Sequence, residues 1–127
     1  HKEQEGDPRQ KSERRRVHRQ ILAGAGVAGL HRARVVVVNP VHVAVALAYR
    51  HGEDEAPWVL ASGTGSAARR IRAAAMRLDV PVVQQVALAR ALRLVEPGDE
   101  IPENLYRATA EVIRSLEEPA LGSVAAG

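Results

Sequence analysis

The sequence predicts an α/β fold, in which a small, mixed, four-stranded sheet is surrounded by helices and preceded by a basic helix. Runs of β-branched and apolar residues indicate strands, and helical stretches separate the later ones. The strand–helix–strand pattern over residues 58–85 implies a right-handed parallel crossover. The 127 residues fit one domain of ordinary size, long enough to bury a core.

The first third of the chain carries the basic charge. Residues 1–34 contain nine Lys or Arg and four Asp or Glu, a balance of +5, whereas the rest of the chain has a balance of −2. Residues 8–23 form a helix whose only large apolar side chains are Val17, Ile21 and Leu22. Because this apolar stripe is thin, we expect a solvated helix that frays.

Residues 24–29 read GAGVAG, which matches the dinucleotide-binding pattern G-x-G-x-x-G. That function requires a preceding strand and an acidic residue about 20 positions later, and both are missing. We therefore interpret these glycines as a flexible connector. The predicted organisation is a basic linker helix with its connector over 1–33, a compact domain over 34–118 and a flexible tail over 119–127.

The elements of the compact domain follow in order. Residues 34–38 read RVVVV, which is typical of a strand buried on both faces. Further strands are predicted at 42–50, 58–62 and 80–85, and helices at 64–78, 87–95 and from Pro102 to Pro119. Thr64 or Ser66 is expected to cap the first of these helices. Leu105, Thr109, Val112 and Leu116 form the apolar stripe of the last one.

The composition excludes several classes of protein. The absence of Cys excludes disulfides and thiolate metal sites, and no His/Asp/Glu cluster has the spacing of a metal site, so we expect no cofactor and no metal. Nor does a signature of a conventional enzyme with turnover occur. The acidic run 53–55 is interpreted as a solvated loop, and Tyr49 and Trp58 as structural residues. His1, His18, His31 and His51 are expected to be exposed.

The pair Asn39-Pro40 interrupts two apolar runs and carries chemistry of its own. The amide nitrogen of an Asn side chain can attack the carbonyl carbon of its own residue, closing a succinimide and breaking the next peptide bond. Pro40 has no backbone N–H, so the competing deamidation route is closed. His42 is the nearest side chain able to transfer a proton near neutral pH. The alternative is that Asn39-Pro40 simply forms a turn.

The stretch VVVVNPVHVAVALAYR resembles the self-cleavage region of the FlhB/YscU family, substrate-specificity switch proteins of flagellar and type III secretion export. The stretches KSERRRVH, EAPWVLASGTG, AARRIRAAAMRLDVPVV, LARAL and EIPENLYRATAEVIRSL follow in the family's order and spacing, so that the resemblance covers residues 8–117. KSERRRVH and AEVIRSL look closer to the virulence-type branch than to the flagellar one. Two positions depart from the family's pattern: Val41 replaces a Thr, and Ala87 replaces a Pro.

The resemblance implies that Asn39 is the nucleophile and scissile residue, that Pro40 becomes a new N-terminus and that His42 assists. Val41 lacks the hydroxyl of the family's Thr, so we expect cleavage that persists but is slowed. The pieces 1–39 and 40–127 are expected to stay together, because the strands beside the cut share one sheet. Cleavage would be a single intramolecular event.

The resemblance also implies a location and partners. The domain would lie at the cytoplasmic face of the bacterial inner membrane, attached to upstream spans, and the chain starts with His1 rather than Met, as expected for a piece of a longer protein. Its partners would be other export-apparatus components, a needle- or hook-length regulator, secreted substrates and its own cleaved segment, with no nucleic acid. The alternative function is a nucleic-acid-binding module that uses the arginines of residues 1–34.

Overall fold

The computed structural model describes residues 8–23, 27–40 and 42–117, with the backbone alone described at 27–28. The element order is α1 (Pro8–Leu22), a 3-10 helix η2 (Val27–Arg32), β1 (Val35–Asn39), β2 (Val43–Ala48), β3 (Trp58–Thr64), α2 (Gly65–Arg77), β4 (Val82–Gln84), α3 (Val86–Leu92), a 3-10 turn η3 (Glu103–Leu105) and α4 (Tyr106–Glu117). The predicted tail 119–127 and the first half of the predicted connector, residues 24–26, lie outside the described residues.

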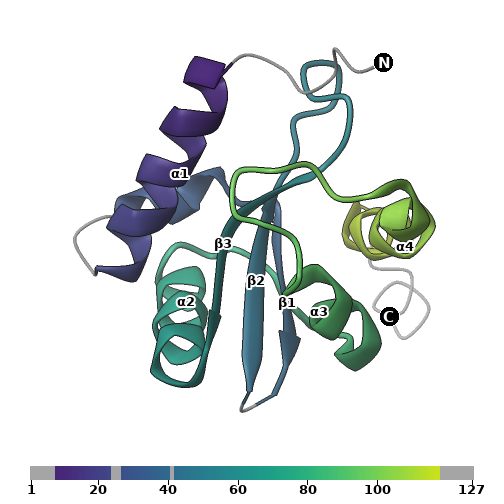
Figure 1. Cartoon of the computed structure of the whole chain (residues 1–127). Coiled ribbons are helices and arrows are strands. Elements are labelled where there is room, and N and C mark those ends of the chain that lie inside the picture. The colour runs from purple at the N-terminus through teal and green to yellow at the C-terminus, as the bar shows by residue number, and fades with distance from the viewer. Residues whose placement is uncertain (1–7, 24–26, 41, 118–127) are drawn as a thin grey trace.

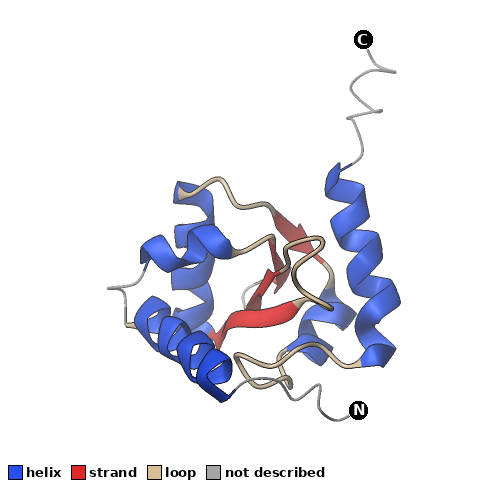
Figure 2. Ribbon diagram, turned by 90° about the horizontal axis from the view of Figure 1, so that it is seen from above, coloured by secondary structure: helices blue, strands red, loops and turns tan. Residues whose placement is uncertain are grey.

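The four strands form one mixed sheet in the order β3-β2-β1-β4. β2 is antiparallel to both β1 and β3, and β4 is parallel to β1. The helices cover both faces: α1 and α2 lie on one side of the sheet, and α3 and α4 on the other (Figures 1 and 2). The predicted α/β fold with a mixed four-stranded sheet is thus confirmed, as is the parallel relation of β3 and β4.

Strand β1 is buried on both faces, as its continuous valine run predicts. Val36 and Val38 belong to the core under α1 and α2, whereas Val35 and Val37 belong to the core under α3 and α4. This alternation follows from the period of two along a strand. In β2 the valines and Leu47 face the same side as Val35 and Val37, and the alanines face α2.

The alanine face of the sheet allows helix α2 to approach closely. Ala44 and Ala46 of β2 meet Ala68 and Ile71 of α2 in one cluster. At the end of β3 there is no room for a side chain: a Cβ atom added to Gly63 would lie 2.6 Å from the Cβ of Ala67. Position 63 therefore has to be glycine for this packing to form.

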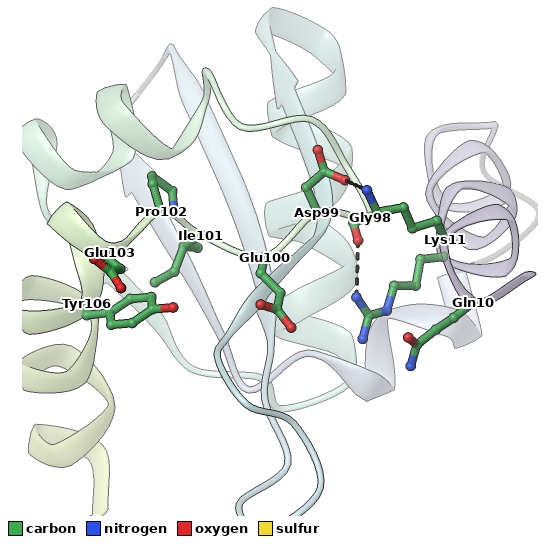
Figure 3. Close-up of a pocket in the computed structure, with 10 residues that line it drawn as sticks. Gln10, Lys11, Gly98, Asp99, Glu100, Ile101, Pro102, Glu103 and Tyr106 are labelled. Carbon is green, nitrogen blue, oxygen red and sulfur yellow. Dashed lines mark hydrogen bonds and ion pairs between the residues drawn. The ribbon is translucent and has the colours of Figure 1, made fainter. Parts of the chain in front are cut away.

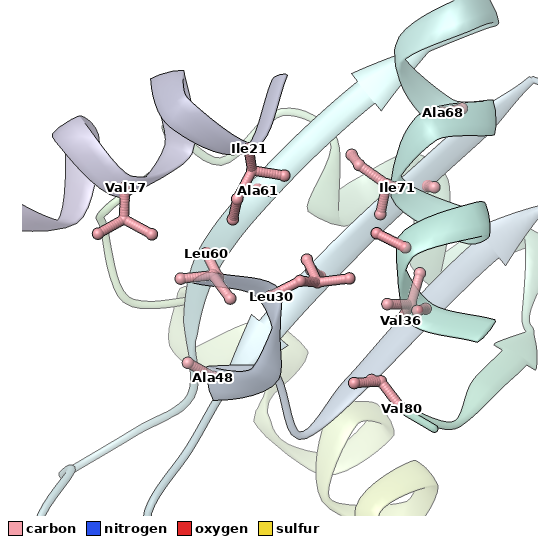
Figure 4. Close-up of a cluster of buried hydrophobic side chains, with 14 of the residues drawn as sticks. Val17, Ile21, Leu30, Val36, Ala48, Leu60, Ala61, Ala68, Ile71 and Val80 are labelled. Atoms are coloured by element: carbon pink, nitrogen blue, oxygen red, sulfur yellow. The ribbon is translucent and has the colours of Figure 1, made fainter. Parts of the chain in front are cut away.

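Helix α1 is docked on the sheet, and the prediction of a solvated, fraying helix was wrong. Val17 and Ile21 are only 4% and 2% exposed, and they join Leu60 and Ala61 in the core (Figure 4). Leu30, in the described part of the predicted connector, is fully buried beside them. Gly29 brings η2 against α1, since a Cβ there would lie 3.2 Å from Cγ1 of Val17.

The later helices follow the predicted pattern with small shifts. Thr64 is the N-cap of α2, but its side chain makes no capping hydrogen bond, and Ser66 lies inside the helix. Helix α4 starts at Tyr106, after a 3-10 turn that Pro102 precedes. Thr109 and Val112 are buried in the predicted stripe of α4, which Ile113 joins, while Leu105 and Leu116 are partly buried.

Within the described ranges, no helix combines the length and hydropathy needed to cross a bilayer. The same residues contain no group of three His, Asp or Glu side chains placed to hold a metal ion.

Candidate functional site

Asn39 lies at the end of β1, where the chain turns back into β2. It pairs with Val43, the first residue of β2, so residues 40–42 make the connection. The backbone N–H of His42 donates a hydrogen bond to the Asn39 carbonyl oxygen, with an N···O distance of 3.0 Å. The predicted turn at Asn39-Pro40 is therefore a tight hairpin between neighbouring strands. Val41, the residue that departs from the family motif, lies outside the described residues.

The turn is anchored to the body on both sides. The Val38 carbonyl accepts a hydrogen bond from the Gln85 N–H at 3.1 Å, which ties the end of β1 to the start of α3. The His42 carbonyl accepts one from the Gly65 N–H at 3.3 Å, at the junction of β3 and α2. Asn39 and Pro40 are half-buried and His42 is exposed. Water therefore reaches the turn, while hydrogen bonds from the starts of α2 and α3 hold the backbone on both sides of it.

A solvent-open hollow of about 870 Å³ lies beside the turn. It is lined by Asn39, His42, Val43, Thr64, Gly65, Arg90, Ala91, Arg93 and Leu94. The two arginines give this hollow a positive charge, and none of its described lining residues is acidic. We did not predict their place beside the turn from the sequence, although the stretch LARALR that follows the fourth strand contains both of them.

A second hollow, of about 370 Å³, lies between α1 and the loop that follows α3 (Figure 3). Lys11 of α1 forms an ion pair with Asp99 at 3.4 Å, and Nη1 of Arg14 donates to the Gly98 carbonyl at 3.2 Å. Gly98 has a φ of +96°, and the α1 backbone passes close to it. Part of the charged face of α1 thus attaches this helix to the loop after α3.

Arg14 is the centre of this docking contact. Its guanidinium carbon lies 4.1 Å from the ring centroid of Trp58, and its Nη2 lies 3.9 Å from a carboxylate oxygen of Asp54. Burial lowers the pKa of Arg14, against the opposing effect of Asp54. Trp58 is structural, as predicted, but Asp54 is not a purely solvated loop residue, because its side chain is only 11% exposed.

His18 lies in the same helix and was wrongly predicted to be exposed. It is half-buried, and its Nδ1 atom is buried with no hydrogen-bond partner among the described residues. Burial lowers the pKa of its imidazole, and Arg19 lowers it further, while Glu96 opposes them. Burial of this side chain thus favours the neutral form of the imidazole.

The family model described as the FlhB HrpN YscU SpaS Family matches residues 1–116. The chain belongs to this family. It is 44% identical over 113 residues to the flagellar biosynthetic protein FlhB of Yersinia enterocolitica, covering 88% of this chain and 30% of that protein. It is 40% identical over 117 residues to the secretion system apparatus protein SsaU of Salmonella typhimurium, covering 91% and 33%.

The chain thus spans about a third of the length of these FlhB/YscU-family relatives. They come from flagellar and from secretion systems, so the predicted closeness to the virulence-type branch remains a prediction. Among solved structures, a mutated EscU C-terminal domain superposes with a TM-score of 0.67 at 31% identity, covering 69% of this chain and 89% of that one. The cytoplasmic domain of FlhB from Shewanella putrefaciens gives 0.66 at 34% identity, covering 76% and 71%.

Proposed function

We propose that this chain is the cytoplasmic switch domain of an export-apparatus protein and that it cuts itself between Asn39 and Pro40. The single observation that carries the proposal is the hairpin at Asn39, in which the carbonyl to be attacked is fixed by the His42 N–H at 3.0 Å. An Asn-Pro pair occurs in EscU as well, because one solved structure has an Asn replaced by Ala and another has the following Pro replaced by Ala.

The reaction is an intramolecular displacement. The side-chain nitrogen of Asn39 attacks the Asn39 carbonyl carbon and forms a new C–N bond, and the bond to the Pro40 nitrogen breaks. The attacking amide of Asn39 loses one proton and the Pro40 nitrogen gains one, so the protons balance. Water or His42 carries them. Residue 39 becomes a succinimide, which a water molecule then opens.

The backbone of the turn stabilises the charge that develops during the attack. As the Asn39 carbonyl becomes tetrahedral, its oxygen gains negative charge, and the His42 N–H already points at it. A fixed donor of this kind lowers the barrier because it needs no reorganisation during the reaction. Arg90 and Arg93, which line the same hollow as Asn39, add positive potential near the turn.

The domain would act at the inner face of the bacterial inner membrane, next to other components of the export apparatus. This placement is supported by two relatives: SsaU is named a secretion system apparatus protein, and the FlhB domain of known structure is cytoplasmic. A length regulator and exported proteins would be the partners of the switch. We propose no catalytic turnover, since the reaction consumes the Asn39–Pro40 bond.

Intact-mass analysis of the purified chain over time tests self-cleavage. We expect the pieces 1–39 and 40–127, with the piece 1–39 first appearing one water lighter than its hydrolysed form. Asn39→Ala should remain intact, whereas Asn104→Ala, which changes the chain's other Asn, should be cut like the wild type. A wild type that stays whole would overturn the proposal, and cutting of Asn39→Ala would indicate a protease.

A further inference from the structure

The junction between β3 and α2 contacts the turn directly. Thr64 ends β3 and pairs with Val43, and Gly65 begins α2. The Gly65 N–H donates to the His42 carbonyl at 3.3 Å, one step beyond the β2–β3 ladder. The peptide groups of His42 therefore bridge two partners: its N–H holds the Asn39 carbonyl, and its C=O is held by Gly65.

This hydrogen bond replaces the usual helix cap. The first N–H groups of a helix have no partner within the helix, and a side chain at the N-cap commonly accepts from one of them. Here Thr64 makes no such bond, and the His42 carbonyl accepts from the first N–H of α2 instead. The positive end of the helix dipole thus favours the position of that carbonyl.

Gly65 has a φ of +55°, in the left-handed region. Residues other than Gly, Asn and Asp are strained in this backbone conformation. A Cβ atom added at Gly65 would meet no heavy atom within 4 Å, so a substitution acts through the backbone alone. A β-branched residue would drive this φ to negative values and turn the N–H away from the His42 carbonyl.

We propose that Gly65 is a positioning residue for cleavage at Asn39–Pro40. It fixes the carbonyl side of His42, so that the N–H side stays on the carbonyl that Asn39 attacks. This role rests on the proposed self-cleavage. Small displacements of groups near a reacting atom cost large factors in rate, and we expect Gly65→Val to slow cleavage by about 10-fold to 100-fold.

The chain offers a matched control for the strain itself. Gly52 has a φ of +88° and, like Gly65, has nothing within 4 Å of an added Cβ. We expect Gly52→Val to leave the cleavage rate within about two-fold of the wild type, since its strain does not reach the turn. Gly65→Asn should recover most of the rate, because Asn tolerates the left-handed region.

Intact-mass time courses of Gly65→Val, Gly52→Val and Gly65→Asn measure these cleavage rates. If circular dichroism shows that Gly65→Val is unfolded, Gly65→Ala takes its place. Slow cleavage in Gly65→Val, or in Gly65→Ala where it is used, with recovery in Gly65→Asn, supports the positioning role. Equal rates in the Gly65 and Gly52 variants, or no recovery with Asn, would overturn it.

A second measurement separates this inference from the proposed function. In the Asn39→Ala background, which cannot cyclise, amide hydrogen exchange reports the bond from the His42 N–H to the carbonyl of residue 39. Gly65→Val should speed exchange of the His42 amide, and Gly52→Val should not. If the wild type is never cut, the proposed function fails, and this exchange result still decides whether Gly65 positions the turn; unchanged exchange would refute it.

Discussion

Replacing Arg14 by Ala tests how α1 is attached to the domain. The change removes the cation–π contact to Trp58 at 4.1 Å, worth about 0.5–2 kcal/mol, and the hydrogen bond to the Gly98 carbonyl at 3.2 Å, worth about 1.5–3 kcal/mol. The Asp54 contact at 3.9 Å adds little. Desolvation of the guanidinium offsets part of these gains, so we expect the free energy of unfolding to fall by about 2–3 kcal/mol.

Urea denaturation followed by Trp58 fluorescence measures this effect, since the sequence contains a single Trp, which lies next to Arg14. With an ordinary denaturant slope, the midpoint should fall by about 1 M or more. Arg16→Ala is the matched control in the same helix: Arg16 pairs with Glu13, but both side chains are about half exposed, so the loss should be much smaller than that of Arg14→Ala. Equal losses for Arg14→Ala and Arg16→Ala would refute the docking argument.

Two further predictions concern buried polar groups. The pKa of His18 is lower in the folded chain than in the unfolded one, so the unfolded chain binds its proton first as the pH falls. The free energy of unfolding should therefore decrease as the pH falls below about 6.5. Urea titrations at several pH values should show a smaller decrease for His18→Gln than for the wild type. An equal decrease in both chains would show that His18 is not the group responsible. The hydroxyl of Thr109 is fully buried without a hydrogen-bond partner among the described residues. Thr109→Val should raise the free energy of unfolding by about 1 kcal/mol in the same assay, whereas a loss would reveal a partner of the hydroxyl.

The sheet could be predicted because its pattern is local. Four consecutive valines in Val35–Val38 favour a strand buried on both faces, and the apolar run that follows residue 42 is held to it by a short connection. The packing of α1 could not be predicted in the same way. Val17 and Ile21 form a thin stripe, and what completes their attachment, Trp58 and Gly98, lies far along the chain.

In the candidate site, too, the local features could be predicted from the sequence and the long-range contacts could not. The Asn39–His42 turn could be predicted from adjacent residues, because the chemistry of Asn before Pro depends on sequence neighbours. The contribution of Gly65 could not, because it depends on a hydrogen bond between segments 23 positions apart, 42 and 65. The only signal was a Gly in the first turn of the predicted helix 64–78, where Gly is an unfavourable helix former but can also mark a helix boundary.

The position of β1 determines what the proposed cut would change. β1 lies between β2 and β4, and Val35, Val36 and Val37 are fully buried. At about 1.5–3 kcal/mol for each buried valine, these three side chains alone contribute about 5–9 kcal/mol, which is comparable to the whole stability of a domain. Separating 1–39 from 40–127 therefore requires unfolding of the sheet. The proposed cut would free only the Pro40 end and leave the hydrogen bond between His42 and Gly65 in place, so the switch would act by moving the turn rather than by releasing a fragment.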